Sequence, residues 1–229
     1  MSGRSDDRSL QQPSRPVTSA RADISAADVA RLRACLAGDG VAVIPTDTVY
    51  GLACNPDSET ALRRIYELKR RPPVKPAAVM FFSLASALAS LPELGPLTRT
   101  AFEALLPGPV TLLLANPEKR FQAACEPAGR GAGLLGLRVP SLAGPLSPLA
   151  TIDLPAAQSS ANLSGGPDPR RLREVPAELR DRADQVLDGG ELAGIASTVV
   201  NLSGYERDGH WQLVREGPLD GAMLKRLLG

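Results

Sequence analysis

Histidine, lysine and aromatic residues are scarce in this chain of 229 residues. It contains one histidine, His210, and aromatic residues make up only 3% of it. A zinc site built from three histidines is therefore excluded, and a Ser-His-Asp triad would depend on His210 alone. Only 4 of the 26 basic residues are lysines. The net charge of +1 argues against a protein that coats nucleic acid over its whole surface. It does not exclude a local basic patch.

Cysteines are few, and long apolar runs are missing. Cys35, Cys54 and Cys125 form neither a CxxC pair nor an even disulfide set, and no secretory signal is recognisable. These features predict reduced thiols in a cytoplasmic protein. The apolar runs are short and interrupted, which predicts no transmembrane helix. A P-loop motif, GxxxxGK[ST], is also absent from the sequence.

The pattern along the chain predicts one α/β domain after a polar arm. Residues 1–23 have almost no bulky apolar side chains, so we expect a disordered arm followed by a domain over 24–229. Apolar runs predict strands at 41–44, 78–82, 110–114, 134–139, 186–187, 198–202 and 212–214. Helices are expected from Ser25, with Asp28 completing a capping box, and from Ser58, and small polar residues from Gln158 onward predict a loop. This alternation favours a mixed sheet.

A polar cluster follows the first predicted strand. Residues 45–52, PTDTVYGL, place two hydroxyls, a carboxylate and a phenol within five positions. Loops at the carboxyl ends of strands are common ligand positions in α/β proteins. The cluster could therefore orient a small polar substrate, or it could be an ordinary Asx-type or Ser/Thr-type turn.

A basic cluster ends the second predicted helix. Residues 69–76, KRRPPVKP, hold two of the four lysines and two arginines in a proline-stiffened segment. Several fixed cations suit a polyphosphate. The alternative is a helix C-terminus complemented by basic residues, but that role needs only one or two cations. The prolines therefore favour a functional site.

Two further segments carry polar groups. Residues 159–166, SSANLSGG, could bring backbone N–H groups close to an anion, or form an ordinary loop. Arg138 lies inside an apolar predicted strand, where an unpartnered buried charge costs several kcal/mol. It therefore requires an acidic partner or an anionic ligand, and its spacing does not choose between them.

Taken together, the segments resemble a known family. PTDTVYGL, KRRPPVKP, PGPVT, GLRVP, SSANLSG, LDGG, STVV and VREG occur over about residues 25–220 in the order of the YrdC/Sua5 family. Members are threonylcarbamoyl-AMP synthases, which act in making the threonylcarbamoyladenosine (t6A) of tRNA. The resemblance is to the short YrdC type. It implies a single YrdC-like α/β domain, a twisted mixed sheet with helices around a large concave basic cavity.

The resemblance also implies a reaction. L-threonine, bicarbonate or CO₂, and ATP would give threonylcarbamoyl-AMP and pyrophosphate, so the activity is that of a nucleotidyltransferase. Mg²⁺ is the implied cation, with no protein ligand assigned to it. The implied partners are a tRNA threonylcarbamoyl-transferase complex that receives the product, and tRNA itself.

The same resemblance assigns roles to individual residues. Lys69 and Arg71 match the catalytic KxR signature. The residues that match threonine-binding positions are Thr48, Arg138, Ser160 and Ser197, and those that match ATP-binding positions are Lys69, Arg71, Lys75, Asn162 and Arg215. Fixed cations and hydroxyls suit this chemistry, because its main task is to align two anions and neutralise their repulsion.

Departures from the family pattern and two rivals accompany the resemblance, and the departures include Ala196 where a Glu often precedes the ST pair and Asn201 where an Asp often ends STVVD. Met80 stands where Sua5-type members carry a histidine in a threonine-contacting position. The first rival is a module that binds tRNA or double-stranded RNA in a basic concavity without synthase activity. The second is the YrdC-like domain of hydrogenase-maturation carbamoyltransferases, whose zinc-finger and acylphosphatase segments do not fit in 229 residues with three cysteines.

Overall fold

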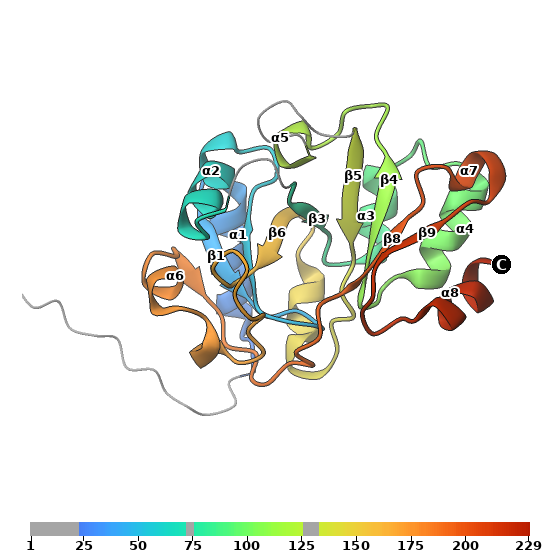
Figure 1. Cartoon of the computed structure of the whole chain (residues 1–229). Coiled ribbons are helices and arrows are strands. Elements are labelled where there is room, and N and C mark those ends of the chain that lie inside the picture. The colour runs from blue at the N-terminus through green and yellow to red at the C-terminus, as the bar shows by residue number, and fades with distance from the viewer. Residues whose placement is uncertain (1–22, 72–75, 126–132) are drawn as a thin grey trace, which may run out of the picture.

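One mixed sheet organises the computed structural model, which describes residues 23–71, 76–125 and 133–229. Within these residues the strands lie in the order β7-β1-β2-β6-β3-β5-β4-β8-β9 (Figure 1). Their bounds are β1 Val41–Ile44, β2 Gly51–Cys54, β3 Ala78–Met80, β4 Val110–Ala115, β5 Leu134–Arg138, β6 Ala156–Ser160, β7 Gln185–Val186, β8 Thr198–Asn201 and β9 Gln212–Arg215. The predicted α/β class with a mixed sheet is confirmed. The predicted arm falls, apart from Asp23, outside the described residues.

Helices flank the sheet at both of its ends. Figure 1 shows α1 and α2 beside β1, and α4, α7 and α8 beside β8 and β9. The α-helices are α1 Ala26–Ala37, α2 Glu59–Leu68, α3 Leu84–Ser90, α4 Pro96–Leu105, α5 Gln122–Cys125, α6 Ala177–Asp181, α7 Tyr205–Asp208 and α8 Gly221–Leu228, with 3-10 helices η2 Gly144–Thr151 and η3 Leu172–Glu174. The predicted capping box is present, because the Asp28 N–H donates to Ser25 Oγ and the Ser25 N–H donates to the Asp28 carboxylate. None of these helices is long and apolar enough to cross a membrane.

Two central strands, β2 and β6, were not predicted. The expectation of a loop from Gln158 onward is wrong for residues 158–160, since Ala156–Ser160 forms β6 and pairs antiparallel with both β2 and β3, and it is confirmed from Ala161 on. Both strands are short and rich in small residues, so neither gives a strong apolar pattern. Their neighbours in the sheet hold them in place, and that pairing cannot be seen in the local sequence.

The two faces of the sheet have different environments. One face carries Val43, Leu52, Val79, Leu112 and Leu137, and these pack in a large core with residues of α2, α4 and α5. The opposite face is covered at one end by α1 and η2, which pack on residues such as Ile44 and Met80. Farther along the sheet, residues of β3, β4, β5, β6, β8 and β9 line a cavity instead of a core.

Tyr50 ties the start of β2 to residues 188–190. Its hydroxyl lies 2.9 Å from Asp188 Oδ1 and 2.8 Å from the Gly190 carbonyl, and it accepts a hydrogen bond from the Gly189 N–H at 2.9 Å. Burial raises the pKa of this phenol well above its usual value, so it stays protonated at neutral pH. The fully buried Tyr50 side chain therefore holds residues 188–190, which precede Ser197 in the chain.

We predict that Tyr50→Phe lowers the free energy of unfolding by about 1–3 kcal/mol, because the Gly189 N–H loses its acceptor and the hydroxyl contact with Asp188 and the Gly190 carbonyl is lost. Chemical denaturation of the wild type and the variant measures this difference. Tyr205→Phe is the matched control. Its hydroxyl donates a hydrogen bond to the Leu228 carbonyl near the chain end. Equal effects for the two variants would contradict the anchoring role of Tyr50.

Candidate functional site

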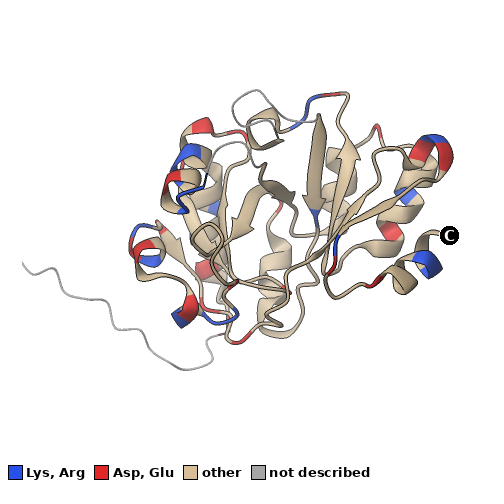
Figure 2. Ribbon diagram, viewed as in Figure 1, with Lys and Arg blue, Asp and Glu red and all other residues tan. Residues whose placement is uncertain are grey.

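A cavity of about 400 Å³ opens on the second face of the sheet, and we call it the arginine cavity. Three arginines from three separate parts of the chain line it, together with hydroxyl and small apolar side chains. Its lining residues are Val49, Arg71, Pro76, Ala77, Ala78, Thr111, Leu113, Leu134, Gly136, Arg138, Gln158, Ser159, Ser160, Asp168, Ala196, Ser197, Val199 and Arg215. Most other charged residues lie on the helices and loops around the sheet (Figure 2).

Arg138 ends β5 and is only 3% exposed. Its Nη2 donates to Asp47 Oδ1 at 2.6 Å and to Thr48 Oγ1 at 3.1 Å. The second carboxylate oxygen of Asp47 accepts from the Ser141 N–H at 3.0 Å, so the carboxylate is held from both sides. The sequence left two partners open for Arg138, and the acidic one is present.

Part of the Arg138 guanidinium stays unused, however. Its Nε is buried and has no hydrogen-bond partner within the described residues. Burial lowers the pKa of Arg138, and Asp47 opposes that shift. Because Arg138 also lines the arginine cavity, a guanidinium held by one carboxylate is suited to contact a second, anionic ligand there.

Thr48 and Met80 lie beneath the cavity rather than on its wall. Thr48 is fully buried and its hydroxyl lies 3.0 Å from that of Thr46, so it supports Arg138 from below. Met80 is 1% exposed and packs in the core under α1 and η2. The residue that departs from the Sua5 pattern is therefore a core residue in this chain.

Ser197 and Arg215 form the opposite wall. Arg215 Nη2 donates to the Ser197 carbonyl at 2.7 Å, and the Ser197 hydroxyl lies 2.8 Å from that of Thr111. Gly217 packs so closely against the backbone of 196–198 that a Cβ there would collide with the Thr198 nitrogen. The STVV and VREG segments are thereby locked together, which fixes Arg215 at the cavity.

Lys69, the C-cap of α2, holds the loop that follows β6. Its Nζ donates to the Ser160 carbonyl, to the Asn162 carbonyl at 2.9 Å and to Asn162 Oδ1 at 2.8 Å. An ammonium has three N–H donors, so all of them are used. Lys69 is 2% exposed, and burial, assisted by Arg71 and opposed by Asp168, lowers its pKa to about 8.

Asn162 and Arg71 extend this network in two directions. The Asn162 carboxamide donates to the Gly166 carbonyl at 2.6 Å and to Asp168 Oδ1 at 3.1 Å, which closes the loop on itself. Arg71 donates to Ser159 Oγ at 2.8 Å and lines the cavity. Of the two described members of the KxR signature, Arg71 therefore faces the cavity while Lys69 lies behind its wall.

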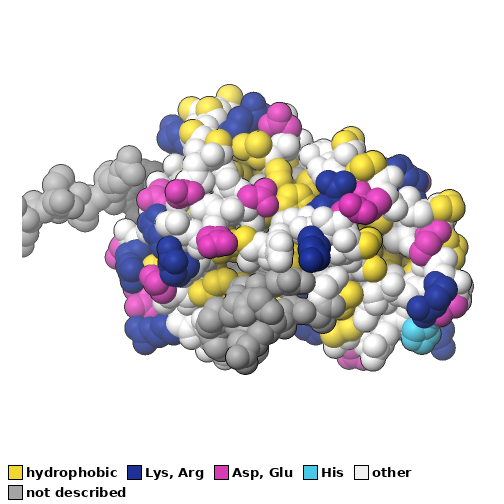
Figure 3. All heavy atoms as spheres, turned by 90° about the horizontal axis from the view of Figure 1, so that it is seen from above, with side chains coloured by type: hydrophobic (Ala, Val, Ile, Leu, Met, Phe, Trp, Pro, Cys, Tyr) yellow, Lys and Arg dark blue, Asp and Glu magenta, His cyan; other side chains and the backbone are white. Residues whose placement is uncertain are grey.

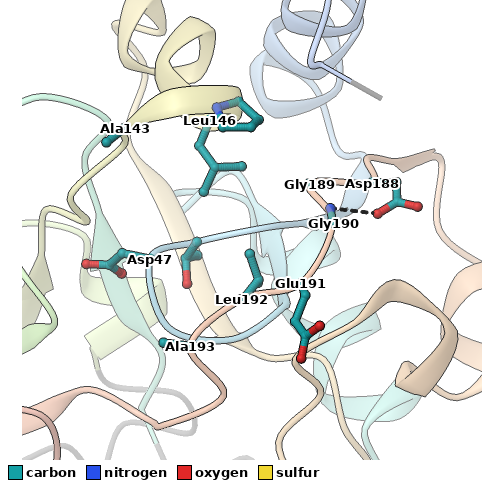
Figure 4. A pocket seen from close by; sticks show the side chains of 11 residues that line it. Asp47, Ala143, Leu146, Asp188, Gly189, Gly190, Glu191, Leu192 and Ala193 are labelled. Carbon is teal, nitrogen blue, oxygen red and sulfur yellow. Dashed lines mark hydrogen bonds between the residues drawn. The ribbon is translucent and has the colours of Figure 1, made fainter. Parts of the chain in front are cut away.

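A second cavity, of about 600 Å³, adjoins the loop after β1, and we call it the aspartate cavity. Asp47, Asp188 and Glu191 line it with Leu146 and Leu192 (Figure 4). Asp188 accepts from the Gly190 N–H at 2.9 Å, the bond drawn in that view. Each carboxylate here already has a partner, since Asp47 pairs with Arg138 and Glu191 pairs with two arginines.

The arginine cavity gathers most of the predicted site residues. Five of them line it: Arg71, Arg138, Ser160, Ser197 and Arg215. Thr48, Lys69 and Asn162 are buried directly behind the wall, and Lys75 lies outside the described residues. The sequence did not single out Asp168 or Gln158, which also line the cavity, because neither occurs in a pattern that suggests chemistry.

The charge pattern limits other kinds of site. The described residues contain no group of three His, Cys, Asp or Glu side chains that could hold a metal ion. Seen from above, the described surface carries Lys and Arg interspersed with Asp and Glu (Figure 3). This face therefore carries no single continuous basic area among the described residues.

These features define an α/β protein with an arginine-lined cavity on one face of its sheet. The sequence profile of the Sua5/YciO/YrdC family, described as telomere recombination, matches residues 34–217. The chain therefore belongs to the Sua5/YciO/YrdC family, and the resemblance inferred from the eight segments is confirmed at that level.

Several relatives carry the same protein name. A mouse protein named threonylcarbamoyl-AMP synthase is 36% identical over 184 residues, which cover 77% of this chain and 62% of the mouse protein. A Xanthomonas campestris protein of that name is 36% identical over 169 residues, covering 71% of this chain and 86% of its own length. The chain spans a smaller share of others of that name, 52% of the one from Pyrococcus abyssi and 56% of the one from Bacillus subtilis.

A solved structure supports the same placement. The crystal structure of P. abyssi Sua5 complexed with L-threonine superposes with a TM-score of 0.74 and 28% identity, over 88% of this chain and 57% of that one. The YrdC-like fold expected from the sequence is thereby confirmed.

We predict that the Lys69 ammonium loses its proton near pH 8. Lysine Cε–Hε NMR signals of a protein with four lysines can be followed through a pH titration, and Lys69→Arg identifies the Lys69 signal by its loss. Because the unfolded chain titrates near 10.5, the folded state binds fewer protons between the two values, so the contribution of Lys69 to stability rises over that window. A midpoint at or above pH 10 would contradict the buried, three-acceptor environment.

Proposed function

We propose that this protein is an L-threonylcarbamoyl-AMP synthase of the nucleotidyltransferase class, acting in t6A formation. The observation that carries the proposal is Arg138, a buried arginine that Asp47 holds in place at a cavity lined by two further arginines. The names of the relatives and the threonine complex of Sua5 support the same proposed function.

The proposed chemistry has two steps. The threonine amine attacks the carbon of bicarbonate, water leaves, and a carbamate forms. A carbamate oxygen then attacks the α-phosphorus of ATP, an O–P bond forms, and the bond to the pyrophosphate oxygen breaks so that pyrophosphate leaves with that electron pair. Because a weak anionic nucleophile meets an anionic phosphoryl group, the protein's contribution is alignment and neutralisation of charge.

The residues divide between the two substrates. Arg138 and Ser197 are proposed to hold threonine, with Thr48 supporting Arg138 from below and Ser160 completing that side. Arg71 and Arg215 are proposed to face the nucleotide, and Lys75 joins them by the resemblance alone. Lys69 and Asn162, which belong to the predicted ATP set, contribute through the loop that they hold.

Mg²⁺ fits this proposal as a companion of ATP. Magnesium bound to a nucleotide takes most of its ligands from phosphates and water and often only one or two from protein carboxylates. Asp168 is the carboxylate that lines the arginine cavity within the described residues, so it is the residue that would contact the ion. When bound, Mg²⁺ would neutralise charge on the phosphates.

The direct test is synthesis. Purified protein with ATP, Mg²⁺, bicarbonate and L-threonine should release pyrophosphate and form a product with the mass of threonylcarbamoyl-AMP. Serine and valine in place of threonine report on specificity. Absence of threonine-dependent pyrophosphate would refute the proposal, and binding of folded RNA without turnover would favour the RNA-binding alternative.

Two variants should distinguish the residues that bind threonine from those that bind ATP. We predict that Arg138→Lys raises the KM for threonine about tenfold to a hundredfold more than the KM for ATP, since a charged hydrogen bond is worth about 1.5–3 kcal/mol. Lysine keeps a positive charge opposite Asp47, so the fold is less disturbed than by alanine. Arg71→Ala should show the opposite preference, and equal changes in both KM values would contradict the assignment.

The wider context is part of the same proposal. The protein would act in the cytoplasm and pass its short-lived product to a tRNA threonylcarbamoyl-transferase complex, with tRNA as a further contact. Mixing the protein with such a complex and unmodified tRNA should yield t6A that depends on this chain.

A further inference from the structure

Gln158 is an unusual residue for its position in the sheet. It lies in the middle of β6, paired with Ala53 of β2 on one side and Ala78 of β3 on the other. Gly136 continues the same row on β5, because Val79 pairs with Leu137 in the parallel ladder. The neighbours are thus small and apolar, and Gln158 is the polar exception in a row that lines the arginine cavity.

The Gln158 carboxamide has no hydrogen-bond partner among the described residues. The residue is only 6% exposed, yet its side chain makes no hydrogen bond to any of the described residues. It lies over Gly51, where a Cβ would collide with its Nε2, so the absence of a side chain at 51 leaves room for it. Its carboxamide faces the open cavity, where a bound ligand would accept from its N–H donors.

The position of Gln158 places it between the two proposed substrates. The next residue, Ser159, accepts from Arg71, which is assigned to the nucleotide. Arg138, assigned to threonine, is two residues beyond Gly136 on the same face of the sheet. A neutral donor between these arginines can contact an oxygen of the reacting group without adding to the charge there.

We propose that Gln158 is a catalytic residue of the synthase reaction, donating a carboxamide N–H to an α-phosphate oxygen as the carbamate attacks. This rests on the proposed function. A donor aimed at charge that develops in the transition state stabilises it more than the ground state. Gln158 therefore acts mainly on kcat, whereas the arginines act on substrate binding.

The first experiment measures kinetics. Gln158→Met fills the space over Gly51 without an N–H donor, and Gln158→Glu keeps the shape but offers a carboxylate. Gln185→Met on β7 is the matched control. We expect kcat to fall about 100-fold in Gln158→Met, and at least as far in Gln158→Glu, with both KM values within about threefold and Tm unchanged. A kcat for Gln158→Met within twofold of the wild type would overturn the proposal and leave Gln158 as a space-filling residue.

The second experiment does not need turnover. In protein labelled with ¹⁵N-glutamine, the Gln158 NH₂ signals are identified by their loss in Gln158→Met. Adding ATP and Mg²⁺ without threonine should shift these signals and slow their exchange with water, while the Gln185 signals stay in place. If ATP binds and the Gln158 signals do not move, the contact is refuted. If they move but no threonylcarbamoyl-AMP forms, the proposed reaction fails while the nucleotide contact stands.

Discussion

The buried ion pair between Asp47 and Arg138 is the interaction on which the site depends. It joins the loop after β1 to the end of β5, which lie on different parts of the sheet. Breaking such a pair by removing one partner typically costs about 3–5 kcal/mol, because a charge is left buried and uncompensated. Asp47 is itself held by the Ser141 N–H, so Arg138 is fixed in orientation before any ligand arrives. The cation is thus ready for a carboxylate without losing freedom on binding.

A second buried cation organises the other end of the cavity in a different way. Lys69 uses its three donors on residues 160–162, so its charge stabilises a loop and does not face the cavity. Arg71, two residues later, faces it. This division explains how one short basic segment can serve both architecture and binding. It also means that loss of activity on replacing Lys69 would not by itself identify a phosphate contact.

The sequence predicted those parts of the fold that local signals determine. Ser25 with Asp28 marked the start of α1, and the apolar run 41–44 marked β1. The strands β2 and β6 were not predicted, because Gly51, Ala157 and Ser160 have low strand propensity. Pairing with strands distant in sequence places them. Most of the described predicted site residues gather at one cavity because the segments PTDTVYGL, KRRPPVKP, PGPVT, GLRVP, SSANLSG, STVV and VREG all contribute residues to its lining. The burial of Lys69 and Thr48 behind its wall, and the exposure of Gln158 to it, depend on side-chain direction, which spacing along the chain does not reveal.

The central claim is that Arg138 marks the place of the threonine carboxylate. A crystal structure of the full chain with L-threonine tests this most directly. We predict a threonine carboxylate in the arginine cavity, within hydrogen-bond distance of the Arg138 guanidinium, with the Asp47–Arg138 pair intact. Threonine bound instead in the aspartate cavity, or bound only after Arg138 has left Asp47, would contradict it.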